Sequence, residues 1–196
     1  RDFSLSAVQR KDGPPWRLLQ VASINKIKDP FTLLRAMALV VERHPDAVLD
    51  WVGADTLDGQ AQRLAVQLGI RANVIFHGFK DYAHMPAFFA AAHVFVQSSL
   101  HESQGVAVCE AAAAGVPVVG TDVGILSELA PDRAVAAPIQ RPDLLAHAVL
   151  SVLEDGERRR GLAARAREWA SSHDADWTAD QFEATYEHCL LKRGRE

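Results

Sequence analysis

Short runs of β-branched and apolar residues alternate along this chain with longer segments of helical periodicity, and this alternation limits the fold more than any other feature. Six of the short runs are predicted as strands: residues 18–22, 47–52, 74–76, 94–97, 117–120 and 134–137. Eight longer segments are predicted as helices: residues 31–43, 59–68, 85–92, 105–114, 125–129, 143–154, 157–171 and 176–191. Strands that alternate with helices require right-handed crossovers and therefore a parallel sheet.

The predicted fold is an α/β domain with a Rossmann-like, doubly wound parallel sheet of about six strands, helices on both faces and a C-terminal run of helices. Near-continuous apolar strands such as Val94–Val96 fit a sheet that is covered on both sides. The 196 residues, 48% of them hydrophobic, suffice for one core without a disulfide or a metal. Ligands of such folds bind beyond the carboxyl ends of the strands, so a site is expected in the loops that follow them.

Composition excludes several classes of partner. The chain has 21 Lys and Arg against 25 Asp and Glu, a formal charge of −4, which lacks the basic excess of nucleic-acid-binding proteins. The longest apolar stretches, residues 87–96 and 106–119, are interrupted by polar residues, glycine or proline and do not suit a membrane span. The two cysteines, Cys109 and Cys189, belong to no pairing motif, which favours reduced thiols and a cytoplasmic location.

One loop has the chemistry of an anion site. Residues 98–105, Ser-Ser-Leu-His-Glu-Ser-Gln-Gly, lead directly into the predicted helix, whose first N–H groups and dipole favour a ligand such as phosphate. Glu110 lies one to two turns into that helix and leans back toward the same cleft, where its carboxylate could accept hydrogen bonds from two ribose hydroxyls. Glu102 approaches from the loop. The alternative is a structural Glu110 that caps a neighbouring loop and a solvated Glu102.

The stretch 94–111, with Glu102 and Glu110 separated by seven residues, resembles the E-x7-E signature of retaining glycosyltransferases with the GT-B architecture. These form the "group 1" family of glycogen-synthase-like and mannosyltransferase-like enzymes. The likeness continues through residues of the next conserved block of the family: Ala113, Gly115, Val116–Val119, Thr121, Gly124 and Glu128. It extends from about residue 18 to residue 186 and identifies the chain with the C-terminal, nucleotide-sugar-binding domain of that family.

The resemblance implies a glycosyltransferase that moves a hexosyl unit from a nucleoside diphosphate sugar to an acceptor hydroxyl, with retention and without a metal or another cofactor. Glu102 would contact hydroxyls of the transferred sugar, and Glu110 would hold the ribose. The backbone N–H groups of Ser103, Gln104 and Gly105 would face the sugar and the diphosphate.

The family also places an arginine and a lysine, five positions apart, after the first strand of this domain. Here Ser23 stands at the arginine position and Lys28 at the lysine position, where its charge would stabilise the leaving diphosphate. Lys26 is a candidate for the second cation; a solvated surface lysine is the alternative. Gly78 belongs to a turn that in relatives lies near the nucleotide base. Ser98 replaces a proline that is usual in the family.

The same resemblance predicts how the chain is organised. Residues 1–16 would be a linker from a missing N-terminal acceptor domain, and residues 17–196 the donor-binding domain, which alone would be inactive. The acceptor, a glycan, a lipid or another hydroxyl compound, would bind through the missing domain. Trp177, Phe182 and Tyr186 recur at helical spacing, and their packing partner is expected in that domain.

Three alternatives stay open. The chain could be a non-catalytic nucleotide-binding or interaction module of the same fold, or, as a third choice, a sugar-nucleotide epimerase. The arginine-rich segment 158–167 could contact anionic lipid at the cytoplasmic membrane face, but a solvated helix face is favoured, because Glu157 and Glu168 interleave with the arginines. The D-x-D sequence at residues 174–176 is expected to begin the last helix and not to bind a metal.

Overall fold

The computed structural model describes residues 12–193, and strands alternate with helices through most of this range. The strands are β1 (Arg17–Val21), β2 (Val48–Val52), β3 (Val74–Gly78), β4 (Val94–Gln97), β5 (Val118–Thr121) and β6 (Ala134–Ala137). The α-helices are α1 (Pro30–Arg43), α2 (Gln60–Gln67), α3 (Met85–Ala91), α4 (Val106–Ala113), α5 (Ile125–Leu129), α6 (Pro142–Leu153), α7 (Gly156–Ser172) and α8 (Ala175–Arg193). Two 3-10 turns, η1 (Arg71–Asn73) and η2 (Tyr82–His84), are too short to leave a periodic signal and were not predicted.

The strands form one parallel sheet in the order β3-β2-β1-β4-β5-β6. The chain lays down β1, β2 and β3 in one direction, returns through α3 to place β4 beside β1, and continues outward to β5 and β6. The strand order therefore reverses between β1 and β4, as in a doubly wound nucleotide-binding sheet. This topology confirms the predicted fold class.

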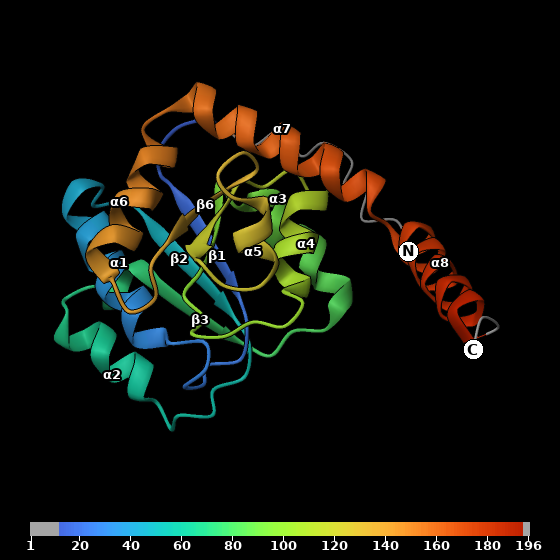
Figure 1. Ribbon diagram of the computed structural model, residues 1–196. Coiled ribbons are helices and arrows are strands. Elements are labelled where there is room, and N and C mark those ends of the chain that lie inside the picture. The colour runs from blue at the N-terminus through green and yellow to red at the C-terminus, as the bar shows by residue number, and fades with distance from the viewer. Residues whose placement is uncertain (1–11, 194–196) are drawn as a thin grey trace.

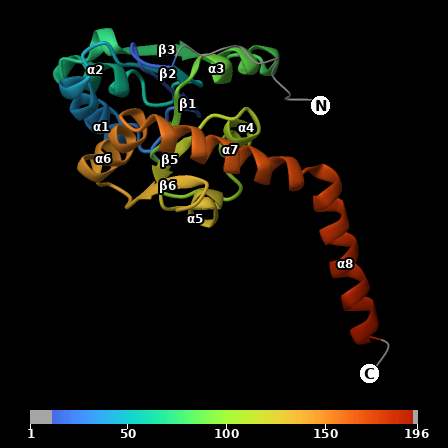
Figure 2. The same ribbon diagram turned by 90° about the horizontal axis from the view of Figure 1, so that it is seen from above.

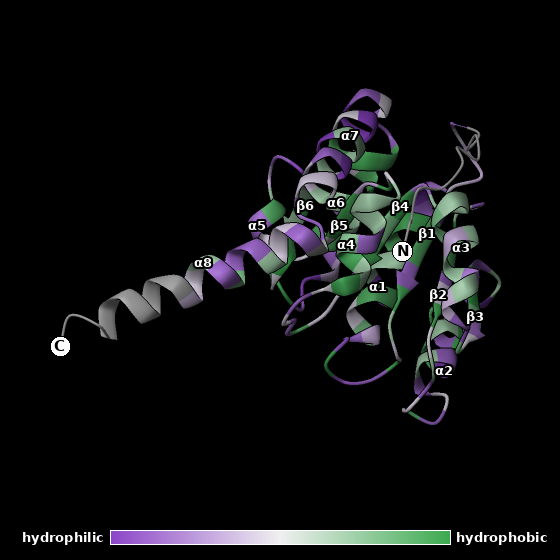
Figure 3. Cartoon of the chain, turned by 90° about the vertical axis from the view of Figure 1, so that its right-hand side faces the viewer, coloured by the Kyte–Doolittle hydropathy of each residue, from purple (hydrophilic) through white to green (hydrophobic). Residues whose placement is uncertain are grey.

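Each face of the sheet has its own hydrophobic core (Figures 1 and 3). One core joins the sheet to α1, α2 and α6 and contains the fully buried Leu34 and Trp51. The other joins it to α3, α4 and α5 and contains Phe89 and Phe95. All four residues of β4 are buried, which is why this strand reads as a continuous apolar run ending in one glutamine.

The last two helices depart from the layered body of the domain. Helix α7 packs on α4 and α6, whereas α8 projects away from the sheet (Figures 1 and 2). The aromatic residues predicted to form a stripe there, Trp177, Phe182 and Tyr186, are exposed by 41%, 59% and 65%. Apolar side chains of this size in the open are typical of a surface that another segment covers.

Arg159 connects the beginning of the described chain to the junction of α6 and α7. Its Nη1 donates hydrogen bonds to the carbonyls of Val152 (3.1 Å) and Leu153 (2.6 Å), which end α6, and its Nη2 pairs with Asp12. Its guanidinium lies 4.7 Å above the ring of Trp16. Only 7% of Arg159 is exposed, so it is wrong to count it with the solvated face of the arginine-rich helix. Arg158, Arg160, Arg165 and Arg167 are exposed as predicted.

We expect Arg159→Met to lower the free energy of unfolding by about 2–4 kcal/mol, because two terminal carbonyls of α6 and the packing on Trp16 are lost together. Urea denaturation followed by circular dichroism measures the loss. Arg160→Met is the matched control, since this neighbour also pairs with Asp12 but is exposed, and should change the free energy by less than about 0.5 kcal/mol. Equal losses in the two variants would contradict the role given to Arg159.

Candidate functional site

The reversal of strand order between β1 and β4 places two loops side by side at the carboxyl edge of the sheet. A cavity of about 330 Å³ opens between them. It is lined by residues from the end of β1 and its loop, from the end of β4, and from the loop and first turns of α4: Val21, Ala22, Lys28, Gln97, Glu102, Ser103, Gln104, Gly105, Val106, Ala107 and Glu110. The cavity lies where a doubly wound sheet binds its ligand.

The N-terminus of α4 forms one wall of this cavity. Gly105 is the N-cap residue, with φ of 65°, and no side chain caps the helix. The first N–H groups of an α-helix have no partner within the helix and carry its positive dipole end. Because Ser103 to Ala107 all line the cavity, this wall suits an anionic group.

Two glycines allow the α4 loop to pack closely against the β5–α5 connection. A Cβ on Gly105 would lie 2.8 Å from Cγ2 of Ile125, and a Cβ on Gly124 would lie 2.8 Å from the carbonyl oxygen of Glu102. Both glycines also have positive φ, 65° and 57°. The backbone of Glu102 therefore packs directly against Gly124, where a side chain would clash with it.

Lys28 and Glu102 meet inside the cavity. The Lys28 Nζ lies 2.5 Å from Oε2 of Glu102, and their side chains are 24% and 13% exposed. The backbone of Lys28 is fixed as well, because its N–H donates to Oδ1 of Asn25 and its carbonyl accepts from the hydroxyl of Ser98. The opposite charges of Lys28 and Glu102 therefore neutralise each other within the cavity.

Ser98, which stands where the family usually has proline, joins the two loops. Its hydroxyl is 2.8 Å from the Lys28 carbonyl oxygen and 2.9 Å from that of Asp29, and the residue is fully buried. Thr121 of β5 donates in turn to the carbonyl of Ser99 (2.6 Å). A proline could make neither side-chain bond, so the departure from the family pattern stabilises the position of Lys28.

Glu110 faces the cavity from the second turn of α4 and is half-buried. Burial raises the pKa of its carboxyl above the ordinary value, and a hydrogen bond with the Tyr82 side chain opposes this only in part. Sequence reasoning missed Tyr82, because it lies in the short turn η2, which has no periodic pattern. It also missed Gln97, which reads as the end of a buried strand.

The structure brings together some of the predicted site residues and leaves others outside. Lys28, Glu102, Ser103, Gln104, Gly105 and Glu110 all line the cavity. Ser23 and Lys26 are exposed in the loop after β1, and Gly78 ends β3 with its carbonyl accepting from Gly53 (2.9 Å). None of these three lines the cavity. Ile24, which follows Ser23, is buried and donates to the carbonyl of Ala54 beyond β2 (2.8 Å).

Within the described range, no three His, Cys, Asp or Glu side chains are close enough to one another to hold a metal ion. In the D-x-D sequence, Asp174 accepts a hydrogen bond from the backbone N–H of Trp177 (2.9 Å) near the start of α8. Across the same residues, no helix has the length and apolar character needed to cross a bilayer.

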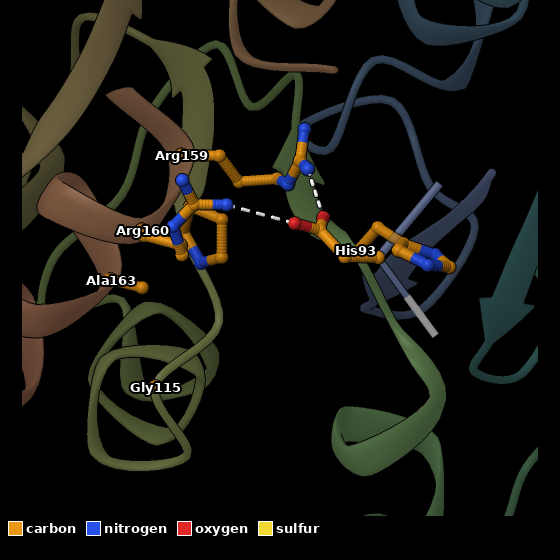
Figure 4. A pocket seen from close by; sticks show the side chains of 7 residues that line it. His93, Gly115, Arg159, Arg160 and Ala163 are labelled. Atoms are coloured by element: carbon orange, nitrogen blue, oxygen red, sulfur yellow. Dashed lines mark hydrogen bonds and ion pairs between the residues drawn. The ribbon is translucent and has the colours of Figure 1, made fainter. Parts of the chain in front are cut away.

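A second cavity, of about 290 Å³, lies at the opposite, amino-terminal edge of the strands (Figure 4). His93 and Pro117 precede β4 and β5 there, and Arg159 and Arg160 extend into it from α7. Both arginines already pair with Asp12, and Arg159 also binds the carbonyls of α6. Because both guanidinium groups already have partners within the chain, we assign the residues of this cavity a structural role.

The raised pKa of Glu110 means that its charged form destabilises the folded domain. The cost is present above the folded-state pKa, shrinks as pH falls through it, and disappears below the unfolded-state value, where both states are protonated. Glu110→Gln should therefore raise the melting temperature at about pH 7 and raise it less at about pH 5. Differential scanning calorimetry measures the difference, with Glu42→Gln on exposed α1 surface as the control. A gain that does not depend on pH would contradict this account.

Comparisons with known proteins agree with this fold. Residues 3–169 match the family model described as Glycosyl transferases group 1. The chain is 36% identical over 180 residues to the D-inositol 3-phosphate glycosyltransferase of Thermomonospora curvata, covering 86% of this chain and 42% of that protein. It is 32% identical over 198 residues to the phosphatidyl-myo-inositol mannosyltransferase of Mycobacterium tuberculosis, covering 94% and 51%.

Among solved structures, HepE of Anabaena in complex with UDP superposes with a TM-score of 0.79 at 22% identity, covering 90% of this chain and 49% of that one. This likeness shows a shared fold. The chain thus spans about half, or less, of the length of these relatives. On the family match across most of its residues, the chain belongs to the group 1 glycosyl transferases.

Proposed function

We propose that this chain is the donor-binding domain of a retaining glycosyltransferase, which moves a hexosyl unit from a nucleoside diphosphate sugar to an acceptor hydroxyl. One observation carries the proposal. Lys28, Glu102, Glu110 and the uncapped N-terminus of α4 line a single cavity at the reversal of strand order. The UDP present in the Anabaena neighbour supports a nucleoside diphosphate as part of the ligand.

The proposed mechanism follows from where charge develops. As the bond between sugar and diphosphate breaks, the diphosphate gains negative charge and the sugar acquires oxocarbenium character. Lys28 and the N–H groups at the start of α4 stabilise the departing oxygens, in the manner of an oxyanion hole. Glu102 orients the sugar through its hydroxyls, and Glu110 accepts hydrogen bonds from the ribose. These groups neutralise the diphosphate without a metal ion, and no residue is assigned as a covalent nucleophile.

Ser23 distinguishes this site from the pattern of the family. The second cation that relatives have there is missing, and Lys26 is exposed outside the cavity. In this proposal the helix N-terminus supplies the share of stabilisation that the arginine would give. The competing function, a nucleotide-binding module without turnover, rests on the same serine and on the pairing of Lys28 with Glu102.

We further propose that a second domain supplies the acceptor site, consistent with the share of its relatives that the chain spans. The exposed aromatic side chains of α8, Trp177, Phe182 and Tyr186, would pack on it. A cytoplasmic location, with the exposed arginines of α7 available to an anionic membrane surface, completes the proposal.

Isothermal titration calorimetry with UDP, GDP and ADP tests the proposed donor site. At least one of them should bind, and Glu110→Ala should weaken that binding by about 10-fold or more, because two hydrogen bonds from the ribose to a carboxylate are lost. Glu42→Ala controls for the removal of a carboxylate elsewhere. The proposal fails if none of the three nucleotides gives heat, or if Glu110→Ala binds as tightly as the unaltered chain.

Glu102→Gln should change the binding of nucleoside diphosphate in the opposite direction. The ion pair must open before Lys28 can reach a phosphate, so its removal should tighten binding up to about fivefold at low salt. Lys28→Met should weaken the same binding. Calorimetry at two ionic strengths measures both effects. If Glu102→Gln weakened binding as much as Lys28→Met does, Glu102 would not compete with the diphosphate for the lysine.

A further inference from the structure

Gln97 is a buried polar residue of the cavity that the predicted site does not explain. It ends β4, is 4% exposed, and its Nε2 is buried without a hydrogen-bond partner among the described residues. An unmet donor in the interior destabilises a fold, and native structures retain few of them. A buried polar group without a partner is therefore a candidate for hydrogen bonding to a ligand.

A glycine on the adjacent strand lets β5 and α5 pack closely on Gln97, since a Cβ on Gly120 would lie 2.6 Å from the carbonyl oxygen of Gln97. Gly120 of β5 is the register partner of Gln97, and a Cβ on Gly120 would lie 3.2 Å from Cγ of Gln97 and 2.8 Å from Cδ1 of Leu126. The glutamine thus lies against the apolar core that contains Leu126. An aliphatic side chain of similar length would suit this position without leaving a donor unpaired.

Other buried polar atoms of the described residues also lack partners, but their places differ. Oε1 of Gln20 and Oε1 of Gln62 belong to residues that line none of the cavities described above, and Nε1 of Trp16 lies near the α6–α7 junction. Gln97 is the member of this group that lines the cavity with Lys28, Glu102 and Glu110. In Gln97, a buried donor without a partner and a place in the candidate site therefore occur in the same residue.

The chemistry of the amide indicates which part of a nucleotide sugar it would contact. A diphosphate accepts hydrogen bonds only, and Lys28 and the start of α4 already offer it charge and donors. A carboxamide presents a donor and an acceptor together, which fits a hydroxyl that both donates and accepts. Of the parts of a nucleotide sugar, the hexose carries free hydroxyls that Glu110, assigned to the ribose, does not bind. The base also pairs donors with acceptors, but it is part of the nucleoside diphosphate too, so binding compared with and without the hexose distinguishes the two contacts.

We propose that Gln97 hydrogen-bonds a hydroxyl of the transferred sugar and thereby contributes to the choice of hexose. This inference rests on the proposed donor site, whose own test is the loss of nucleoside diphosphate binding in Glu110→Ala. Gln97 needs no charge change and no movement of the backbone to do this, because terminal amide torsions turn within a broad range.

Gln97→Met is the informative variant, since methionine keeps the length of the side chain and removes both polar groups. Calorimetry compares the nucleoside diphosphate that binds with its hexose conjugate, UDP with UDP-glucose in the first instance, or GDP with GDP-mannose. We expect the variant to bind the nucleoside diphosphate within about twofold of the unaltered chain and the conjugate about 10-fold more weakly. Its melting temperature should be equal or higher, because an unpaired buried donor is gone.

Equal weakening of both ligands in Gln97→Met would overturn the inference, since Gln97 would then only shape the cavity. An unchanged affinity for the conjugate would overturn it too. A second variant, Gln97→Leu, also removes both polar groups without adding charge near the diphosphate, and should likewise weaken the conjugate more than the nucleoside diphosphate. If the unaltered chain binds no nucleoside diphosphate, the proposed function fails first and this inference with it.

Discussion

The pairing of β1 with β4 is the contact on which the rest of the site depends. Leu18 and Leu19 lie in register with Val94 and Phe95, and this ladder joins segments more than seventy residues apart. Because the strand order reverses there, the chain leaves β1 and β4 toward opposite faces of the sheet. Their loops separate above the strands, and the resulting crevice receives the N-terminus of α4.

The polar groups around this crevice divide into two kinds. Those that position the loops are satisfied within the chain: Ser98 binds the carbonyls of Lys28 and Asp29, and Thr121 binds that of Ser99. Two residues that line the cavity are less well satisfied: the carboxyl of Glu110 is half-buried with a raised pKa, and Nε2 of Gln97 lacks a hydrogen-bond partner among the described residues. Unpaired groups in a site lower the stability of the fold, and a ligand that pairs with them would stabilise the folded state on binding.

Much of the fold could be predicted from local pattern. Both ends of strand β4 were predicted correctly, because its apolar run is bounded by His93 and by the serines of the loop. Strand β3 runs further than predicted, to Gly78, because a register shift beside Val52 prolongs its pairing with β2. The family resemblance indicated Lys28 for the site, but whether Lys26 would join it could not be predicted. Lys26 and Lys28 share one loop, and a hydrogen bond from distant Ser98 holds the second of them at the cavity.

The amino-acid sequence by itself determined a parallel, doubly wound sheet and a glycine-led helix that carries two glutamates, because strand and helix periods and turn chemistry are local properties. Only the tertiary structure decided which side chains share the cavity. It placed Lys28 on Glu102, left Ser23 and Gly78 outside, and brought in Tyr82 and Gln97. These outcomes depend on strand order and on packing between distant segments, and no local pattern of residues encodes either.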